Sequence, residues 1–204
     1  HLGQSFNRFL EWMEEDGDVA RKIKYLFVVG DTVDGVGVFP GQEEVLDLKN
    51  MEAQYNLLAS YLRRIPKHVT IFLCPGQHDA TRVAEPQPII SKKYATKLYE
   101  IDNLVLVTNP TLIKLSEGGV DFSKNIDGTN ANNASSSEEF KVLMYHGASI
   151  HYLINEIKSL RLMKAHSCPA KAVEHMLKRR HLAPTHSEVV YIPNGEYDPL
   201  VISE

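Results

Sequence analysis

The sequence predicts an α/β domain in which helices cover the faces of a β-sheet. Two observations support this fold class. Short apolar runs typical of buried strands alternate along the chain with segments whose apolar residues recur at helical spacing. The chain also has 204 residues, a length that suits one domain with a sizeable buried core. We therefore expect a single α/β domain over residues 1–204.

The individual elements follow from the same patterns. Strands are expected at residues 25–29, 69–73, 104–107, 111–115, 140–145 and, in the irregular tail, 189–192. Helices are expected at residues 5–16, 43–64, 91–100, 150–164 and 170–181. Pro66 ends the second of these helices.

Residues 116–139 differ in composition from the rest of the chain. They are rich in glycine, asparagine and serine, as in the run Ser135–Ser137. Such a segment is typical of an exposed loop rather than of a packed element. We expect a flexible polar loop, inserted as a hairpin rather than serving as a domain linker.

The composition excludes several classes of protein. Hydrophobic residues make up 43% and charged residues 24%, which is typical of a globular protein rather than a disordered one. No apolar run approaches the roughly 18 residues of a membrane span. Cys74 and Cys168 are far apart and lack a CxxC partner, which favours a reducing, cytoplasmic location over a disulfide framework. The net charge of −4 argues against bulk binding of polyanions.

Polar clusters follow three of the predicted strands. Asp31 follows the first, the pair His78-Asp79 follows the second, and His146 follows the last. Each cluster has an ordinary explanation, because Asp31 can cap a turn, His78-Asp79 can form an Asx turn and His146 can be a buried structural histidine. Ligands of α/β sheets, however, bind beyond the carboxyl ends of strands, where these side chains would meet. Together they predict a shared site for Mn²⁺, Mg²⁺, Fe or Zn²⁺.

The same residues lie in motifs that resemble a known superfamily. The motifs His1–Gly3 (HLG), Gly30–Gly35 (GDTVDG), Gly76–Asp79 (GQHD) and Tyr145–Gly147 (YHG) resemble those of the calcineurin-like metallophosphoesterases. The longer strings of residues 30–42, 75–88 and 180–184 resemble the small, 3′–5′ exonuclease subunits of archaeal family D DNA polymerases. The resemblance covers essentially the whole chain. It implies β-sheets flanked by helices in a four-layer sandwich.

The resemblance also implies a set of metal ligands. These are His1, Asp31, Gln77 and His146. Asp31 would bridge two divalent ions, with Mn²⁺ expected first and Mg²⁺, Fe or Zn²⁺ as alternatives. Gln77 departs from the superfamily, which usually has asparagine at this position, and its extra methylene changes the reach of the amide.

Two further residues gain catalytic roles from the resemblance. His78 would face the scissile phosphate, and Asp79 would orient its imidazole. Arg82 lies close in sequence and is a candidate to bind a phosphate, although a solvated or structural arginine is an equal alternative.

The first residue and the last motif of the family series are not among the 204 residues of this sequence. The family motif places an aspartate two positions before His1, and its last motif, Gly-His-x-His, would follow Ile202. We expect the domain to be truncated at both ends and to show weak or no activity in this form.

The resemblance finally implies a function. The chain would be the proofreading 3′–5′ exonuclease subunit of an archaeal DNA polymerase, acting on primer 3′ ends and paired with a large catalytic subunit. The alternative is a degenerate phosphoesterase fold that serves as a scaffold for that large subunit. Retention of Asp31, His78, Asp79 and His146 favours the enzyme, and a general phosphatase is disfavoured by the longer strings.

Overall fold

A computed structural model describes residues 2–15, 17–116, 119–120, 139–185 and 189–202. Its first sheet is parallel and has the order β1 (Tyr25–Val29), β2 (Thr70–Cys74) and β3 (Leu104–Leu106). In this sheet Val29 pairs with Cys74, so the strands β1 and β2 end side by side. The second sheet is antiparallel and has the order β5 (Gly119–Val120), β4 (Thr111–Ser116) and β6 (Phe140–Met144).

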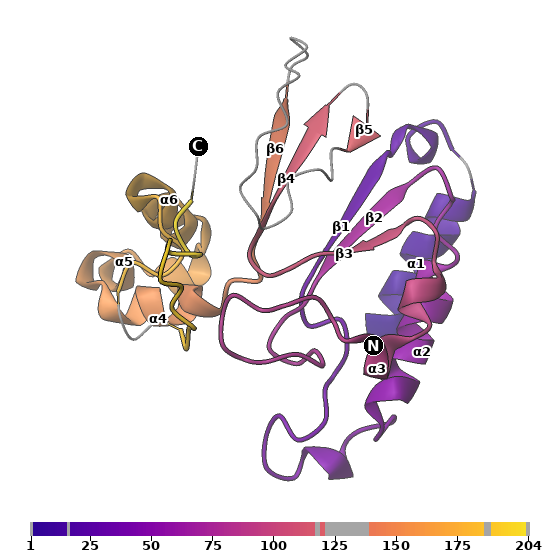
Figure 1. Cartoon of the computed structure of the whole chain (residues 1–204), viewed down its shortest axis with the longest axis horizontal. Coiled ribbons are helices and arrows are strands. Elements are labelled where there is room, and N and C mark those ends of the chain that lie inside the picture. The colour runs from indigo at the N-terminus through magenta and orange to yellow at the C-terminus, as the bar shows by residue number, and fades with distance from the viewer. Residues whose placement is uncertain (1, 16, 117–118, 121–138, 186–188, 203–204) are drawn as a thin grey trace.

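The two faces of the parallel sheet are buried by different layers. Figure 1 shows α1 (Leu2–Glu14), α2 (Met51–Leu62) and α3 (Lys92–Ala95) on one side and the second sheet on the other. Along β2, Ile71 and Leu73 belong to the helix-side core, whereas Phe72 and Cys74 pack between the sheets with Met144. Both faces of β2 are therefore covered, which explains why its residues 71–74 are continuously apolar.

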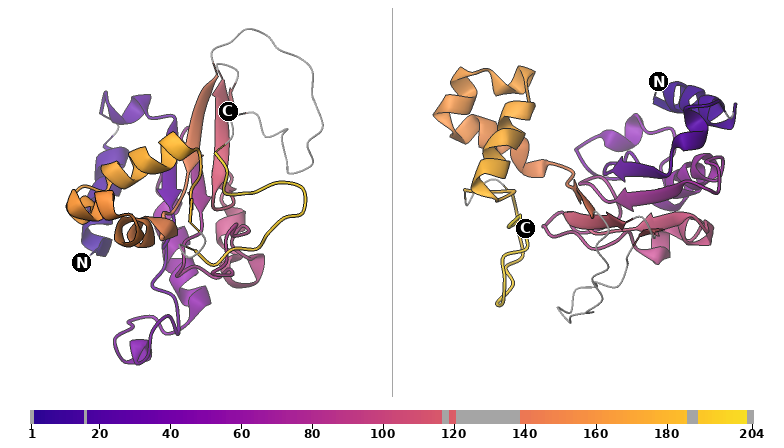
Figure 2. Two further views of the ribbon diagram at one scale, coloured as in Figure 1. Left: turned by 90° about the vertical axis from the view of Figure 1, so that its left-hand side faces the viewer. Right: turned by 90° about the horizontal axis from the view of Figure 1, so that it is seen from above.

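A second group of helices has an apolar core of its own. It comprises α4 (Ala148–Glu156), α5 (Lys158–Leu162) and α6 (Ala170–Arg179). Leu182 and Leu200 complete this core, and the helices lie beside the two sheets (Figure 2). Short 3-10 helices occupy Ala20–Lys22, Gln42–Glu44, Leu98–Glu100 and Ala165–Ser167. The mixed α/β class is confirmed, while the four-layer sandwich and the single domain remain predictions.

Several sequence-based boundaries were wrong. The helix expected from residue 43 begins only at Met51, because the Asn50 side chain accepts the N–H groups of Glu52 and Ala53 and caps the helix there. The helix expected at 150–164 is divided at Ile157, whose backbone is extended. There the guanidinium of Arg161 donates to the carbonyl of Asn155 in the last turn of α4.

Two further expectations need correction or lie outside the described residues. Residues 189–192 do not form a strand but an isolated bridge between Tyr191 and Glu85. Within 116–139, the structure describes Ser116, the short strand β5 and Glu139, and the remainder of the predicted loop lies outside the described residues. Across the described residues, no helix is long and apolar enough to cross a membrane.

Candidate metal centre

The turn after β1 places Asp31 beside the end of β2. Gly30 and Asp31 both have positive φ angles, of 66° and 47°. A left-handed conformation is uncommon outside glycine, and aspartate is among the few residues that tolerate it. Gly30 is required for a second reason, because a Cβ atom at this position would lie 2.1 Å from Nδ1 of His146. The absence of a side chain at residue 30 therefore lets an imidazole pack against this turn.

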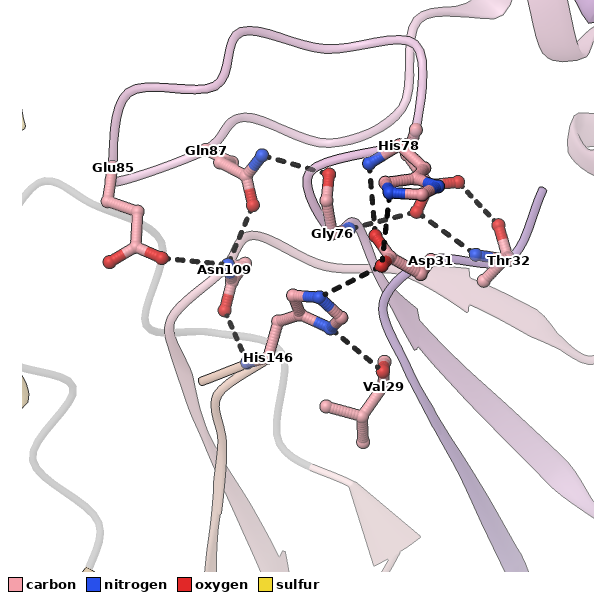
Figure 3. Close-up of polar contacts among 10 residues, drawn as sticks. Val29, Asp31, Thr32, Gly76, His78, Glu85, Gln87, Asn109 and His146 are labelled. Carbon is pink, nitrogen blue, oxygen red and sulfur yellow. Dashed lines mark hydrogen bonds and ion pairs between the residues drawn. The ribbon is translucent and has the colours of Figure 1, made fainter. Parts of the chain in front are cut away.

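The carboxylate of Asp31 is the point at which three segments meet. Its Oδ1 accepts the backbone N–H of His78 at 3.0 Å, and its Oδ2 lies 3.9 Å from Nε2 of His78. The same Oδ2 lies 3.4 Å from Nε2 of His146 (Figure 3). The Asp31 side chain remains 36% exposed, so it is open to a further ligand. The structure thus brings together Asp31, His78 and His146, as the sequence led us to expect.

The geometry of this meeting corrects one part of the sequence argument. Asp31 and His78 follow adjacent strands of the parallel sheet, but His146 follows β6 in the antiparallel sheet. The three groups meet because the two sheets pack face to face through Phe72, Cys74 and Met144. The site therefore lies at the shared edge of two sheets rather than at the end of one.

His146 is held so that one ring nitrogen faces Asp31. Its Nδ1 lies 3.3 Å from the carbonyl oxygen of Val29, and its backbone N–H donates to Oδ1 of Asn109. A proton on Nδ1 would be donated to that carbonyl, which leaves the Nε2 lone pair facing Asp31. The local structure thus favours the tautomer that a metal ion requires.

Asp79 has a different environment from Asp31. It is 4% exposed, and its Oδ2 accepts N–H groups from Thr32 and Gly76. Its Oδ1 accepts the hydroxyl groups of Thr32 and Tyr55. Among the described residues, none of its hydrogen bonds goes to the ring of His78. The predicted role of Asp79 in orienting that ring stays a prediction, while its observed contacts tie the two loops together.

The remaining predicted site residues are less closely associated. Gln77 lies near enough to Glu85 to lower its pKa, but its buried Nε2 makes no hydrogen bond of standard geometry with a described residue. Arg82 donates to the carbonyls of Ala84 and Pro86 in its own loop, which is the structural alternative to phosphate binding. His1 lies outside the described residues.

Sequence reasoning missed a buried polar cluster directly behind the site. Glu85, Gln87 and Asn109 are each at most 1% exposed, and all three are hydrogen-bonded. Burial raises the pKa of Glu85 to about 7, against hydrogen bonds from Tyr145 and Asn109 that lower it. Each of the three residues precedes a proline, and this shared feature is the sequence signal that was overlooked.

The donor chemistry fits a divalent cation, although only part of a binding site is described. Two donors on one ion lie about 3.0–3.4 Å apart. Asp31 Oδ2 and His146 Nε2 are 3.4 Å apart and fit this requirement. Among the described residues, no group of three His, Cys, Asp or Glu side chains is arranged to hold a metal ion. Further donors, such as the amide of Gln77, would be needed to complete the coordination.

Comparison with known proteins decides the family. The sequence model that describes the B subunits of DNA polymerases alpha and epsilon matches residues 3–204. The chain belongs to this family. The predicted resemblance to small subunits of archaeal DNA polymerases is confirmed by its relatives.

Curated relatives of this polymerase B-subunit family member come from several archaea. The chain is 36% identical to the DNA polymerase II small subunit of Pyrococcus horikoshii over 207 residues, covering 98% of this chain and 29% of the relative. It is 34% identical to the protein of the same name from Methanothermobacter thermautotrophicus, covering 100% of this chain and 38% of the relative. It is 33% identical to the protein of the same name from Halobacterium salinarum, covering 88% of this chain and 30% of the relative. The chain thus spans about a third of the length of these relatives.

Proposed function

We propose that the chain is the phosphodiesterase domain of a polymerase small subunit and hydrolyses phosphodiester bonds at DNA 3′ ends. The observation that carries the proposal is the meeting of two imidazoles, from loops of different sheets, at the Asp31 carboxylate. A calcineurin-like fold accounts for the two packed sheets. Membership of the polymerase B-subunit family supports the association with a polymerase.

Asp31 and His146 would hold divalent ions, with His1 and Gln77 as further ligands and Mn²⁺ as the first candidate. Such ions lower the pKa of a bound water and stabilise negative charge on a phosphate. With its Nδ1 proton donated to the carbonyl of Val29, His146 would present Nε2 to such an ion. The carboxylate of Asp31 offers two oxygens at an open surface.

His78 would act on the phosphodiester itself. Its backbone N–H is donated to Asp31, which fixes the loop, while its side chain is 37% exposed beside the carboxylate. An imidazole in this position can donate a hydrogen bond to a phosphate oxygen and deliver a proton to the leaving 3′-oxygen. Asp79 would support this geometry through Thr32 and Gly76 rather than by touching the substrate.

A scaffold without catalysis is the second candidate, and one observation favours it. Among the described residues, the Asp31 site does not assemble the three ligand groups of a complete metal centre. In that case the chain would serve only to bind the large polymerase subunit. The names of the relatives, as small subunits, support a large-subunit partner for either candidate.

An exonuclease assay separates the two candidates. The 204 residues, with any sequence that flanks them in the native protein, are incubated with a 5′-labelled primer and Mn²⁺. We expect shortening from the 3′ end, and we expect Asp31→Asn and His78→Ala to reduce its rate by about 100-fold or more. Asp34→Asn is the matched control, because Asp34 is an exposed carboxylate in the same loop.

Metal binding gives the second measurement. His78→Ala should retain Mn²⁺ binding, measured by electron paramagnetic resonance, whereas Asp31→Asn should lose it. Full activity in His78→Ala would contradict the role assigned to that imidazole. A wild-type protein that neither binds Mn²⁺ nor shortens the primer would contradict the proposed hydrolysis and favour the scaffold.

A further inference from the structure

Two buried amide side chains connect the loops that carry the candidate ligands. Oδ1 of Asn109 accepts the backbone N–H of His146 at 2.9 Å, and Nδ2 of Asn109 donates to Oε1 of Gln87 at 2.7 Å. Nε2 of Gln87 then donates to the carbonyl of Gly76 at 3.0 Å. Figure 3 shows this chain of contacts between Gly76 and His146, to one side of Asp31. We call the pair Gln87 and Asn109 the amide relay.

The backbone holds the relay in place. Gln87 and Asn109 exchange two backbone hydrogen bonds, with N···O distances of 2.7 Å and 3.1 Å. These two backbone hydrogen bonds fix Gln87 and Asn109 side by side, and both side chains extend from this pair. Nε2 of Gln87 also donates to the carbonyl of Arg82, and Nδ2 of Asn109 lies 3.5 Å from Oε1 of Glu85. Every amide group of the relay thus has a partner, as buried polar groups require.

The direction of these hydrogen bonds explains why amides occupy both positions. Asn109 has to accept at one end, from His146, and donate at the other, to Gln87. Gln87 repeats the pattern toward Gly76. Asparagine and glutamine side chains combine one acceptor oxygen with two N–H donors on one planar group, and each amide nitrogen here contacts two oxygens. A carboxylate would leave two acceptors facing each other, and an apolar residue would leave the N–H of His146 unpaired.

The relay ends at the two loops that set the site. Gly76 immediately precedes Gln77 and His78. A Cβ atom on Gly76 would lie 2.4 Å from both the backbone nitrogen and Oδ1 of Asp31. At the other end, His146 faces the same aspartate. The separation between these loops therefore determines whether His146 can approach Asp31 from one side while His78 approaches from the other.

We propose that Gln87 and Asn109 are positioning residues that hold the His146 loop against the Gly76–His78 loop and thereby set the ligand geometry around Asp31. This inference rests on the proposed function for its catalytic meaning. The positioning itself requires no metal ion, so it is tested separately. Both side chains are at most 1% exposed, so they would act through these loops rather than by contacting a substrate.

The test uses Asn109→Leu on the full chain, with Asn103→Leu as its matched control. Asn103 lies at the opposite end of β3, and its Nδ2 also donates to backbone carbonyls, those of Pro66 and Val69. Both variants lose amide hydrogen bonds to the backbone, but only Asn109 contacts a ligand loop. Gln87→Met provides a second variant if Asn109→Leu does not fold.

Two readouts are measured at a temperature at which circular dichroism shows each variant folded. In NMR spectra without metal, Asn109→Leu or Gln87→Met should shift the His146 ring signals and speed exchange of its amide, while Asn103→Leu leaves both unchanged. With Mn²⁺, the relay variants should bind about 10- to 100-fold more weakly, as expected when the partner of a ligand is lost. The Mn²⁺ affinity of Asn103→Leu should stay within about twofold of that of the wild type.

The two readouts separate the possible failures. Unchanged His146 signals in both folded relay variants overturn the inference, and so does an equal change in Asn103→Leu. If the wild-type protein binds no Mn²⁺, the proposed function fails, and the NMR comparison alone decides the positioning role. Altered His146 signals together with unaltered Mn²⁺ affinity would also overturn the inference, because the ligand geometry would then not depend on the relay.

Discussion

Asp31 and Asp79 follow neighbouring strands of one sheet, but their surroundings are opposite. Asp31 accepts one backbone N–H and leaves its other oxygen to two imidazoles at an exposed edge. Asp79 is buried, and both of its oxygens are taken by hydrogen-bond donors of the protein. A carboxylate that can bind a ligand therefore differs from a structural one by the donors that surround it, and the following predictions test this difference.

The largest effect on stability is expected from Asp79→Ala. Its removal leaves the buried N–H of Gly76 and the hydroxyl of Tyr55 without their acceptor. Several lost charged hydrogen bonds should lower the free energy of unfolding by about 4 kcal/mol. For a domain of this size the melting temperature should fall by about 8–16 °C, measured by calorimetry.

Asp31→Asn should show the opposite behaviour. Asparagine tolerates a positive φ, so the free energy of unfolding should change by no more than about 0.5 kcal/mol. Asp102→Ala serves as a control for the loss of an exposed aspartate, since the Asp102 side chain is 89% exposed. Equal destabilisation by Asp31→Asn and Asp79→Ala would remove the distinction between the two carboxylates.

The sequence predicted Asp31, His78 and His146 as neighbours because each follows an apolar strand, and strand ends are well marked. It could not predict that His146 comes from a second sheet, since the pairing of β4 with β6 depends on long-range contacts. The start of α2 was missed because the apolar spacing continues through residues 45–48, while the cap formed by Asn50 decides the boundary.

The amide relay could not be recognised from composition. Gln87 and Asn109 each precede a proline, in segments for which the sequence predicts no helix or strand. Their burial results from the packing of distant loops against each other. A polar residue before a proline is restricted to extended backbone, which suits a bridge between loops. That local signal does not reveal which partner the bridge will meet.

A third carboxylate, that of Glu85, is subject to two opposing effects, because burial raises its pKa and hydrogen bonds lower it. Burial raises its pKa from 4.5 to about 7, so between these values the folded protein binds more protons than the unfolded chain. The free energy of unfolding should therefore fall as the pH rises from about 4.5 to 7, by on the order of 3 kcal/mol in total. Above about pH 8, where Glu85 is ionised in both the folded and the unfolded state, this group should cause no further change.

Glu85→Gln removes that dependence, because the amide stays neutral. Denaturant unfolding in EDTA at pH 5 and pH 8 measures the effect without interference from metal ions. The variant should gain stability relative to the wild type at pH 8 by about 2–3 kcal/mol more than at pH 5. A wild-type stability that rises over this interval, with Glu85→Gln behaving identically, would show that Tyr145 and Asn109 compensate fully for the burial.

A small effect is also expected from a carboxylate with good geometry but no burial. Glu14 accepts two hydrogen bonds from Arg64, at 2.8 Å and 2.9 Å, and thereby connects α1 to the end of α2. Water competes for both partners at this exposed surface, and salt screens their attraction. In a double-mutant cycle of Glu14→Gln and Arg64→Met, the coupling should shift the melting temperature by no more than about 2 °C and should disappear in 1 M NaCl. A coupling as large as the effect of Asp79→Ala would mean that bidentate geometry rather than burial makes a carboxylate structurally important in this chain.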